Sequence, residues 1–385
     1  MDDRATDLWL IGGAVLLMYG AVARSQAFGT LGLLLLVSIL VARAWARYSL
    51  SNVTYTRSLS ADRVYSGECV SLEIVVTNAK PLVLPWLLVE DRLDTHLLAH
   101  NVETERSGRA WEIRHSVAVG WYERVRWRYT IECSRRGYHR IGPTRLASGD
   151  PFGFYERERE LPAQAGVLVY PRLLPVEELD LSSVFPFEGR RSSAGLVPDP
   201  LNVVGARPYV ETDTQRQVHW RATARGAELR SKTTRPTVEP NVVIFLDLAS
   251  TRHPWEGINT EAVERAISAA ATLAHRAHAQ RQPVGLHVNG LRSGTHQRIR
   301  IGAARGDEAL AQIMDVLARV PPYPTIPFVD LLRTERRRAL MGATIVAITA
   351  VGSLEIADQT ALYRRRGCRA VLLDVGASPV EDSAR

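Results

Sequence analysis

Lysine is nearly absent from this chain of 385 residues, and so are blocks of like charge. Lys80 and Lys232 are its only lysines, so arginine supplies almost all of the positive charge, and the formal net charge is +7. The arginines are spread along the sequence, whereas nucleic-acid-binding segments and polybasic membrane tails concentrate their cations in one stretch. These absences argue against a nucleic-acid-binding protein.

Cysteine is also scarce, and its three positions are far apart. Without a CxxC pair, a cysteine-based zinc site is unsupported. The order Cys69, Trp86, Cys133 is similar to that of an immunoglobulin domain, in which the two cysteines form a disulfide. Strand alternation argues against this bond, because it puts Cys133 on the apolar face of its strand and Cys69 on the polar face of its own. We expect both thiols to be reduced.

The chain is longer than one compact core, so we expect several domains. The pattern predicts a two-helix membrane anchor over residues 1–48 and a β-sandwich over 49–165. A linking segment is predicted over 166–240, and an α/β domain over 241–385.

Two long apolar runs open the sequence, Leu8 to Ala23 and Ala27 to Ala42, separated by a short polar turn that contains Arg24. A membrane-spanning helix needs about 20 residues, and roughly 17 are tolerated. The runs are slightly short, but Arg24 can extend its charge to the membrane surface and Trp45 can lie at the interface. We expect an antiparallel helical hairpin that crosses the bilayer twice.

A cleaved signal peptide is the alternative, since Ala21-Val22-Ala23 resembles a cleavage site. The acidic leader and the second apolar run that follows at once argue against it. Arg43 and Arg47 follow the second run, whereas the turn of the hairpin holds only Arg24, so the positive-inside bias places both termini and the soluble part in the cytoplasm. The sequence therefore predicts a multi-pass membrane protein whose soluble part is cytoplasmic.

Residues 49–165 alternate between apolar and polar side chains with a period of two, for example in "CVSLEIVV" and "RVRWRYTIEC". Turn residues such as Ser66-Gly67 and Arg136-Gly137 separate these runs. Short strands joined by turns, without a long helical period, are typical of an immunoglobulin-like β-sandwich. Such modules usually bind or space other domains.

Residues 241–385 follow a different pattern, in which apolar strands alternate with helices. "NVVIFLDLA" is a continuous apolar run that ends at Asp247, and a helical segment follows with Asn259 or Thr260 as its N-cap. This alternation predicts a doubly wound, Rossmann-type α/β fold with a largely parallel sheet. Ligands of such sheets bind beyond the carboxyl ends of the strands, so the loop after Asp247 is a candidate site.

Four motifs together resemble the bacterial domain-of-unknown-function-58 family: "RRGYHRIGP", "DPFGFY", "VYPR" and "RPYVETDTQRQVHWRATARGAEL". The resemblance covers nearly the whole chain. Its central pattern falls on Arg207, Tyr209, Asp213, Arg216, Val218, His219, Trp220, Arg221, Thr223, Ala224 and Arg225. Thr212 stands where the family usually has glycine, which alters the turn before Asp213.

The resemblance implies a membrane-anchored protein with a von Willebrand A-like domain, associated with MoxR-type AAA+ ATPases that act in assembly or maturation. It implies no enzymatic reaction. The family signature supplies candidate interaction residues rather than a catalytic set.

Within the signature, the spacing predicts a short helix capped by Asp213 or Thr214. Four side chains would share one helical face, namely Arg216, His219, Trp220 and Thr223. Arginine pairs with carboxylates and stacks on tryptophan, so we expect Arg216 or Arg225 to brace Asp213 or Trp220.

Two chemical interpretations compete with this structural one. His219 with Asp213 nearby is compatible with a hydrolase, although no nucleophile elbow accompanies the pair. Arg207 and Arg216 near a helix start are compatible with anion binding.

A von Willebrand A-like domain also implies a Mg²⁺ site, which needs several oxygen ligands. Asp247 and Thr251 match the first loop of such a site, but Ala249 supplies no oxygen between them. Thr325 matches the second loop by position, and Thr349 stands where the third loop should offer a carboxylate. We therefore expect a degenerate site without a stable metal, and no other cofactor.

The sequence thus favours a non-enzymatic membrane scaffold whose protein partner is a MoxR-type AAA+ ATPase. A metal-dependent, adhesion-like receptor with its soluble part outside the cell is the first alternative, and an uncharacterised hydrolase is the second.

Overall fold

The computed structural model describes residues 3–100, 104–107, 110–162, 165–175, 198–210, 213–226, 228–236, 241–292, 297–338 and 342–376. The chain forms two compact units, Met1–Tyr170 and Pro171–Arg385, and each is described by itself. The bounds of the four predicted domains stay predictions. The position of Thr212 lies outside the described residues.

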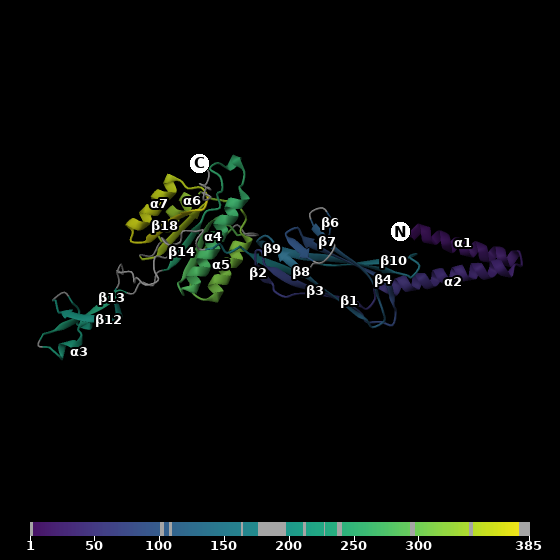
Figure 1. Ribbon diagram of the computed structural model, residues 1–385, viewed down its shortest axis with the longest axis horizontal. Helices are drawn as coiled ribbons and strands as arrows, with labels where there is room; N and C mark the ends of the chain where they lie inside the picture. Colours follow the sequence, from purple (N-terminus) through teal and green to yellow (C-terminus); the bar gives the residue numbers. More distant parts are fainter. Residues whose placement is uncertain are drawn as a thin grey trace, which may run out of the picture. The chain divides into compact units, whose positions relative to one another are not determined.

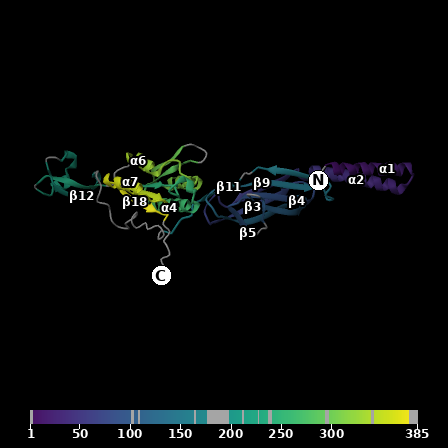
Figure 2. The same cartoon turned by 90° about the horizontal axis from the view of Figure 1, so that it is seen from above.

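Two antiparallel helices open the first unit, α1 (Asp3–Val22) and α2 (Gln26–Ser49), and they lie side by side (Figure 2). Glycine makes their close approach possible: a Cβ at Gly20 would collide with the backbone of Gly29, and one at Gly32 with that of Leu17. Small residues at helix contacts are typical of membrane helices. By length and composition α2 can cross a membrane, whereas the apolar part of α1, Trp9–Val22, is shorter.

The rest of the first unit, Val53–Tyr170, consists of two β-sheets and is called the β module here (Figure 1). The first sheet has the order β1 (Val53–Leu59), β3 (Cys69–Asn78), β8 (Arg124–Cys133), β5 (Leu97–His100). The second has the order β2 (Arg63–Tyr65), β11 (Ala165–Tyr170), β9 (Gly137–Gly149), β4 (Leu84–Asp94), β7 (Ala110–Val119), β6 (Thr104–Ser107), with β10 (Glu156–Leu161) also paired to β9. All pairs are antiparallel except that of β2 with β11.

Apolar side chains from both sheets pack against each other in two clusters, as the period of two requires. Leu72 and Ile74 on β3 alternate with half-buried neighbours, and they join Leu93 and Ile141 of the second sheet in the same cluster. Cys133 is buried while Cys69 is exposed, and both thiols are free, as predicted from strand alternation. Burial is the main cause that raises the pKa of Cys133 to about 11.

The second unit contains an α/β module, residues 241–376, built on a five-stranded sheet. The sheet has the order β16 (Arg298–Ala304), β15 (Val284–Leu291), β14 (Val242–Leu246), β17 (Thr344–Thr349), β18 (Arg369–Asp374). β15, β14, β17 and β18 are parallel to one another, and the edge strand β16 pairs antiparallel with β15. The doubly wound α/β fold predicted from the sequence is confirmed.

Helices cover the two faces of this sheet (Figure 1). α4 (Thr260–Ala279) and α5 (Asp307–Arg319) pack together on one face, and α6 (Phe328–Arg336) and α7 (Leu354–Arg365) pack together on the other. α4 begins after Asn259, whose side-chain oxygen accepts a hydrogen bond from the backbone N–H of Ala262 at 3.2 Å. The predicted cap is therefore confirmed.

Candidate functional site

Three polar side chains meet at the carboxyl edge of the parallel sheet. Asp247 directly follows the central strand β14, Thr349 is the last residue of β17, and Asn289 lies near the end of β15. Because parallel strands end at the same edge, residues separated by more than forty positions in sequence come into contact. All three side chains are buried.

Hydrogen bonds occupy both carboxylate oxygens of Asp247. Oδ1 accepts from Asn289 Nδ2 at 2.7 Å and from the backbone N–H of Ala249 at 2.9 Å, and Oδ2 accepts from Thr349 Oγ1 at 2.8 Å. Burial raises the pKa of Asp247, and these three donors oppose that rise. These hydrogen bonds join the carboxyl ends of β14, β15 and β17, and they are called the Asp247 bracket here.

A Mg²⁺ ion does not fit this site. A hard cation needs oxygen lone pairs directed at it, whereas both oxygens of Asp247 already face hydrogen-bond donors. Asn289 presents its amide NH₂ to Asp247, and its side-chain oxygen accepts from the backbone N–H of Leu248 at 2.9 Å. The donors around Asp247 therefore make this edge a structural bracket rather than a cation site.

The other two threonines predicted near a cation have different roles. Thr251 Oγ1 donates within its own loop, to the backbone oxygens of His253 and Gly257 at 3.2 and 2.9 Å. Thr325 Oγ1 donates to the backbone oxygen of Asn289 at 3.1 Å, so Thr325 does adjoin the carboxyl edge. Both residues stabilise backbone rather than facing Asp247.

The family motif forms a second candidate site, a β-hairpin with a small insertion, called the signature hairpin here (residues 198–236). β12 (Pro198–Pro208) pairs antiparallel with β13 (Arg230–Pro236). Between them lie a 3-10 turn, Gln215–Gln217, and a single helical turn, α3 (Trp220–Thr223). An isolated bridge joins Val218 to Ser231.

Asp213 is the centre of this hairpin. Its carboxylate pairs with Arg207 at 2.5 Å, and it accepts from Ser231 Oγ at 2.8 Å and from the backbone N–H of Val210 at 3.2 Å. Tyr209 Oη donates to the backbone oxygen of Asp213 at 3.0 Å. The hydrogen bond from Arg207, followed by that from Ser231, lowers the pKa of Asp213. This carboxylate holds the two strands and the insertion together.

Two expectations about this segment were wrong. The segment from Arg216 to Thr223 is not one helix, because the bridge at Val218 interrupts it and the backbone N–H of His219 donates to Arg230 O at 2.7 Å. Arg207, rather than Arg216 or Arg225, braces Asp213. Pairing with β13 therefore overrides the local helical period.

The N-caps of this segment are Thr214, which is one of the two predicted candidates, and His219. Thr214, not Asp213, occupies the N-cap position of the 3-10 turn, and its backbone N–H donates to Gln217 Oε1 at 2.9 Å. His219 is the N-cap of α3, and its Nδ1 accepts from the backbone N–H of Ala222 at 3.2 Å. His219 and Asp213 are therefore each engaged in holding backbone.

The surface of the signature hairpin is aromatic and cationic. Trp220 is 68% exposed, and the side chains of Arg216 and Arg225 are exposed as well. Arginine and tryptophan are the residues most enriched at energetically important positions of protein interfaces. This surface therefore has the composition of a docking site.

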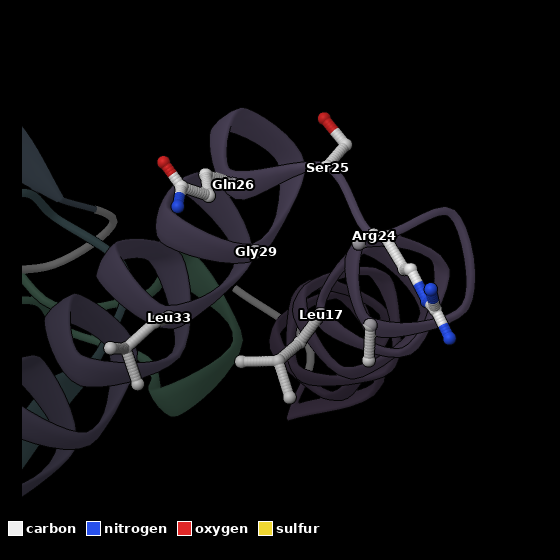
Figure 3. A pocket seen from close by; sticks show the side chains of 8 residues that line it. Leu17, Arg24, Ser25, Gln26, Gly29 and Leu33 are labelled. Atoms are coloured by element: carbon white, nitrogen blue, oxygen red, sulfur yellow. The ribbon is translucent and has the colours of Figure 1, made fainter.

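A shallow depression of about 390 Å³ lies at the turn between α1 and α2 (Figure 3). Leu17 and Arg24 line it from one side, and Gln26, Gly29 and Leu33 line it from the other (Figure 3). It exists because glycine leaves space at the helix contact, and apart from the residues of the turn its lining is apolar. We assign it to helix packing.

Sequence patterns pointed to Asp247 and Asp213 but missed their partners Asn289 and Ser231. A signal for Asn289 was present, because an amide within the apolar strand "VGLHVNG" needs a buried polar partner. Ser231 carried no comparable signal, since its strand is polar throughout.

Comparisons with known proteins give one informative relative. The chain is 21% identical over 246 residues to an uncharacterised protein, YeaD, of Bacillus subtilis, and the match covers 62% of this chain and 56% of that protein. The chain thus spans little more than half the length of this relative.

Among solved structures, a CARDB domain from Pyrococcus furiosus matches 30% of this chain and 86% of its own length, at 13% identity and a TM-score of 0.21. A cohesin module from Clostridium perfringens matches 30% of this chain and 96% of its own length, at 10% identity and a TM-score of 0.23. Similarities at this level establish neither fold nor function.

The family comparison covers the two sites just described. Residues 205–376, which contain the Asp213 network and the Asp247 bracket, match the family model described as protein of unknown function DUF58, so this part of the chain is similar to that family.

Proposed function

We propose that the chain is a non-enzymatic scaffold of the bacterial inner membrane that docks protein partners, with a MoxR-type AAA+ ATPase as the expected partner. Both helices of the α1–α2 hairpin cross the bilayer, and the remainder lies in the cytoplasm. The β module is an immunoglobulin-like spacer, and the α/β module is von Willebrand A-like. Tethering raises the local concentration of the partner at the membrane.

The observation that carries this proposal is the exposed Trp220 on a hairpin that Arg207, Asp213 and His219 hold in shape. Arg207 and Asp213 pair with each other, and His219 caps α3. A rigid hairpin loses little conformational entropy when it binds, which favours tight docking. The guanidinium groups around Trp220 suit an acidic partner surface.

Several observations support the finer assignments. The close, glycine-lined contact of α1 with α2 favours insertion of both helices, and Arg43 and Arg47 near the C-terminal end of α2 favour a cytoplasmic body. The strand order around β14, with Asp247 at its end, supports a von Willebrand A-like module. The donors around Asp247 disfavour the metal-dependent receptor, and the separate roles of Asp213 and His219 disfavour the hydrolase.

A comparative pull-down tests the docking role. Full-length chain carrying Trp220→Ser is solubilised from membranes beside the unmodified chain and beside Trp255→Ser, which alters another exposed tryptophan of the second unit. Loss of one aromatic anchor of roughly 1.4 kcal/mol lowers affinity about tenfold. We expect recovery of the ATPase to fall for Trp220→Ser alone. Equal recovery from all three chains, or no such ATPase from the unmodified chain, would refute the proposal.

A further inference from the structure

The end of the β module at which α2 enters carries three loops, two of which are tied to each other. Trp45 Nε1 on α2 donates to the backbone oxygen of Val83 at 3.2 Å. Lys80 Nζ donates to the backbone oxygens of Ser49 and Ser51. These bonds fix the loop of residues 79–83 to the C-terminal end of α2.

The loop of residues 120–123, between β7 and β8, is joined to the same place. Asn78 Nδ2 donates to the backbone oxygens of Gly120 and Leu82 at 2.7 and 2.8 Å, and the backbone N–H of Tyr122 donates to Lys80 O at 3.3 Å. The tip of this loop is therefore held near the helix end.

The third loop, residues 150–155 between β9 and β10, is the "DPFGFY" motif. The proposed docking of a partner at Trp220 does not involve this motif. The Asp150 carboxylate accepts from the backbone N–H groups of Phe152 and Tyr155 at 2.8 and 2.6 Å, and Gly153 has a φ of +76°. The turn is thus rigid, and glycine suits its conformation. Near its tip, the Phe154 ring lies 6.5 Å from that of Trp9 on α1, so the loop extends along the helical hairpin.

These loops and the adjoining helix ends expose large aromatic side chains. The exposed fractions are 70% for Trp121, 70% for Tyr122, 63% for Phe152, 58% for Tyr48 and 53% for Trp9. Scattered exposed apolar residues are ordinary, but rigid aromatic loops gathered around the end of an apolar helix form a binding surface. Tryptophan and tyrosine are the residues enriched where proteins meet the membrane–water interface.

We propose that the aromatic loops 120–123 and 150–155 insert into the interfacial region of the same bilayer that α2 crosses, so that the β module lies directly on the membrane surface. This inference rests on the proposed membrane anchoring of the hairpin. A phospholipid bilayer is the occupant that the geometry favours, because the aromatic surface is continuous with the apolar helices.

Helix length sets the depth of this surface. From Gln26 to Trp45, α2 rises roughly 30 Å, which equals the thickness of the hydrocarbon core. With the turn of the hairpin at one interface, Trp45 and the attached residue Val83 reach the other. Arg43 and Arg47 are exposed at this level and suit the phosphate groups of lipids.

Depth-dependent fluorescence quenching tests the inference on the full chain. The probe is an NBD dye on Phe152→Cys or Trp121→Cys, each in a Cys69→Ser background, in phosphatidylethanolamine–phosphatidylglycerol vesicles that contain doxyl-labelled lipid. The control is the same dye on native Cys69, which is exposed at the opposite end of β3, about 30 Å from Asn78. Cys133 and Cys368 are buried and do not compete for the dye.

We expect doxyl lipid to quench the dye at positions 152 and 121 and to leave the dye at Cys69 unchanged. If the protein floats with the vesicles but all three positions respond alike, the loop inference falls and the anchor stands. A spectral shift at positions 152 and 121 without doxyl quenching would mean that protein covers the loops, and it also overturns the inference. Protein that does not float with vesicles overturns the anchor and the inference together.

Discussion

Replacing Asp247 by alanine is expected to lower the free energy of unfolding of the α/β module by about 3 kcal/mol. The change leaves the buried amide of Asn289 and the half-buried backbone N–H of Ala249 without their acceptor, and a buried unsatisfied donor costs roughly 1–3 kcal/mol. Thr349 retains a partner, because its hydroxyl proton can turn to the backbone oxygen of Val351, which lies 3.2 Å from Oγ1.

Asp247→Asn is the informative comparison, with an expected cost of about 1 kcal/mol or less. The asparagine oxygen still accepts from Asn289 and Ala249, and its NH₂ can donate to Thr349 Oγ1 while that hydroxyl donates to Val351. Native-state hydrogen exchange at the amides of β14, in detergent-solubilised full chain, reports the difference. Asp330→Ala removes a carboxylate of an exposed i,i+3 ion pair and should change stability by less than roughly 0.5 kcal/mol.

This pair of variants also separates the structural bracket from a metal site. The account predicts that Mg²⁺ leaves the exchange rates of the unmodified chain unchanged, because donors already occupy both oxygens of Asp247. If Mg²⁺ increases the protection of the β14 amides from exchange in the unmodified chain but not in Asp247→Asn, Asp247 belongs to a cation site and the account is contradicted.

Acid is expected to destabilise the α/β module through His287. Burial, followed by the charges of Arg300 and Arg338, lowers the pKa of His287 from 6.5 to about 4. Glu335 lies 3.7 Å from its Nδ1, but this carboxylate also pairs with Arg300 at 3.3 Å and Arg338 at 3.5 Å, so its charge is already compensated. The imidazole is therefore held neutral beside Phe245.

The direction in which stability changes with pH follows from proton binding. Between pH 6.5 and 4 the unfolded chain binds a proton at this histidine and the folded chain does not, so stability is lost as the pH falls through this window. The loss attributable to His287 is about 2–3 kcal/mol. His287→Phe keeps a ring against Phe245 without titrating, and its stability should fall less steeply over the same window. Hydrogen exchange of the β15 amides measures the stability of the unmodified chain and of His287→Phe at each pH. Equal loss of stability in the two chains as the pH falls would contradict the role given to His287.

Sequence reasoning succeeded where local pattern decides structure. The continuous apolar strand ending at Asp247, the cap at Asn259 and the opposite facing of Cys69 and Cys133 each follow from a single segment, and the structure contains all three. Sequence reasoning failed where a strand that is distant in sequence decides the local structure. The helical period after Asp213 is real, but Val218 joins β13 instead of continuing a helix.

The candidate sites show the same division. Asp247 and Asp213 stand out in the sequence as isolated carboxylates beside ordered elements. Thr349 was placed near Asp247 by the resemblance, but the partners Asn289 and Ser231 lie 42 and 18 residues from their carboxylates in sequence, and only the sheet pairing selects them. The edge strand β16 also escaped prediction, although "RIRI" alternates clearly, because a short polar edge strand shows little apolar character.

The central claim is that a membrane hairpin holds the folded body on the cytoplasmic side, and native Cys69 tests it most directly. This thiol is exposed on the β module, whereas Cys133 and Cys368 are buried. In spheroplasts treated with a membrane-impermeant maleimide, the account predicts no labelling of Cys69 until the membrane is opened. A Ser25→Cys probe at the turn of the hairpin, in a Cys69→Ser background, should label before opening. Labelling of Cys69 in sealed spheroplasts, with protection of position 25, would contradict the account.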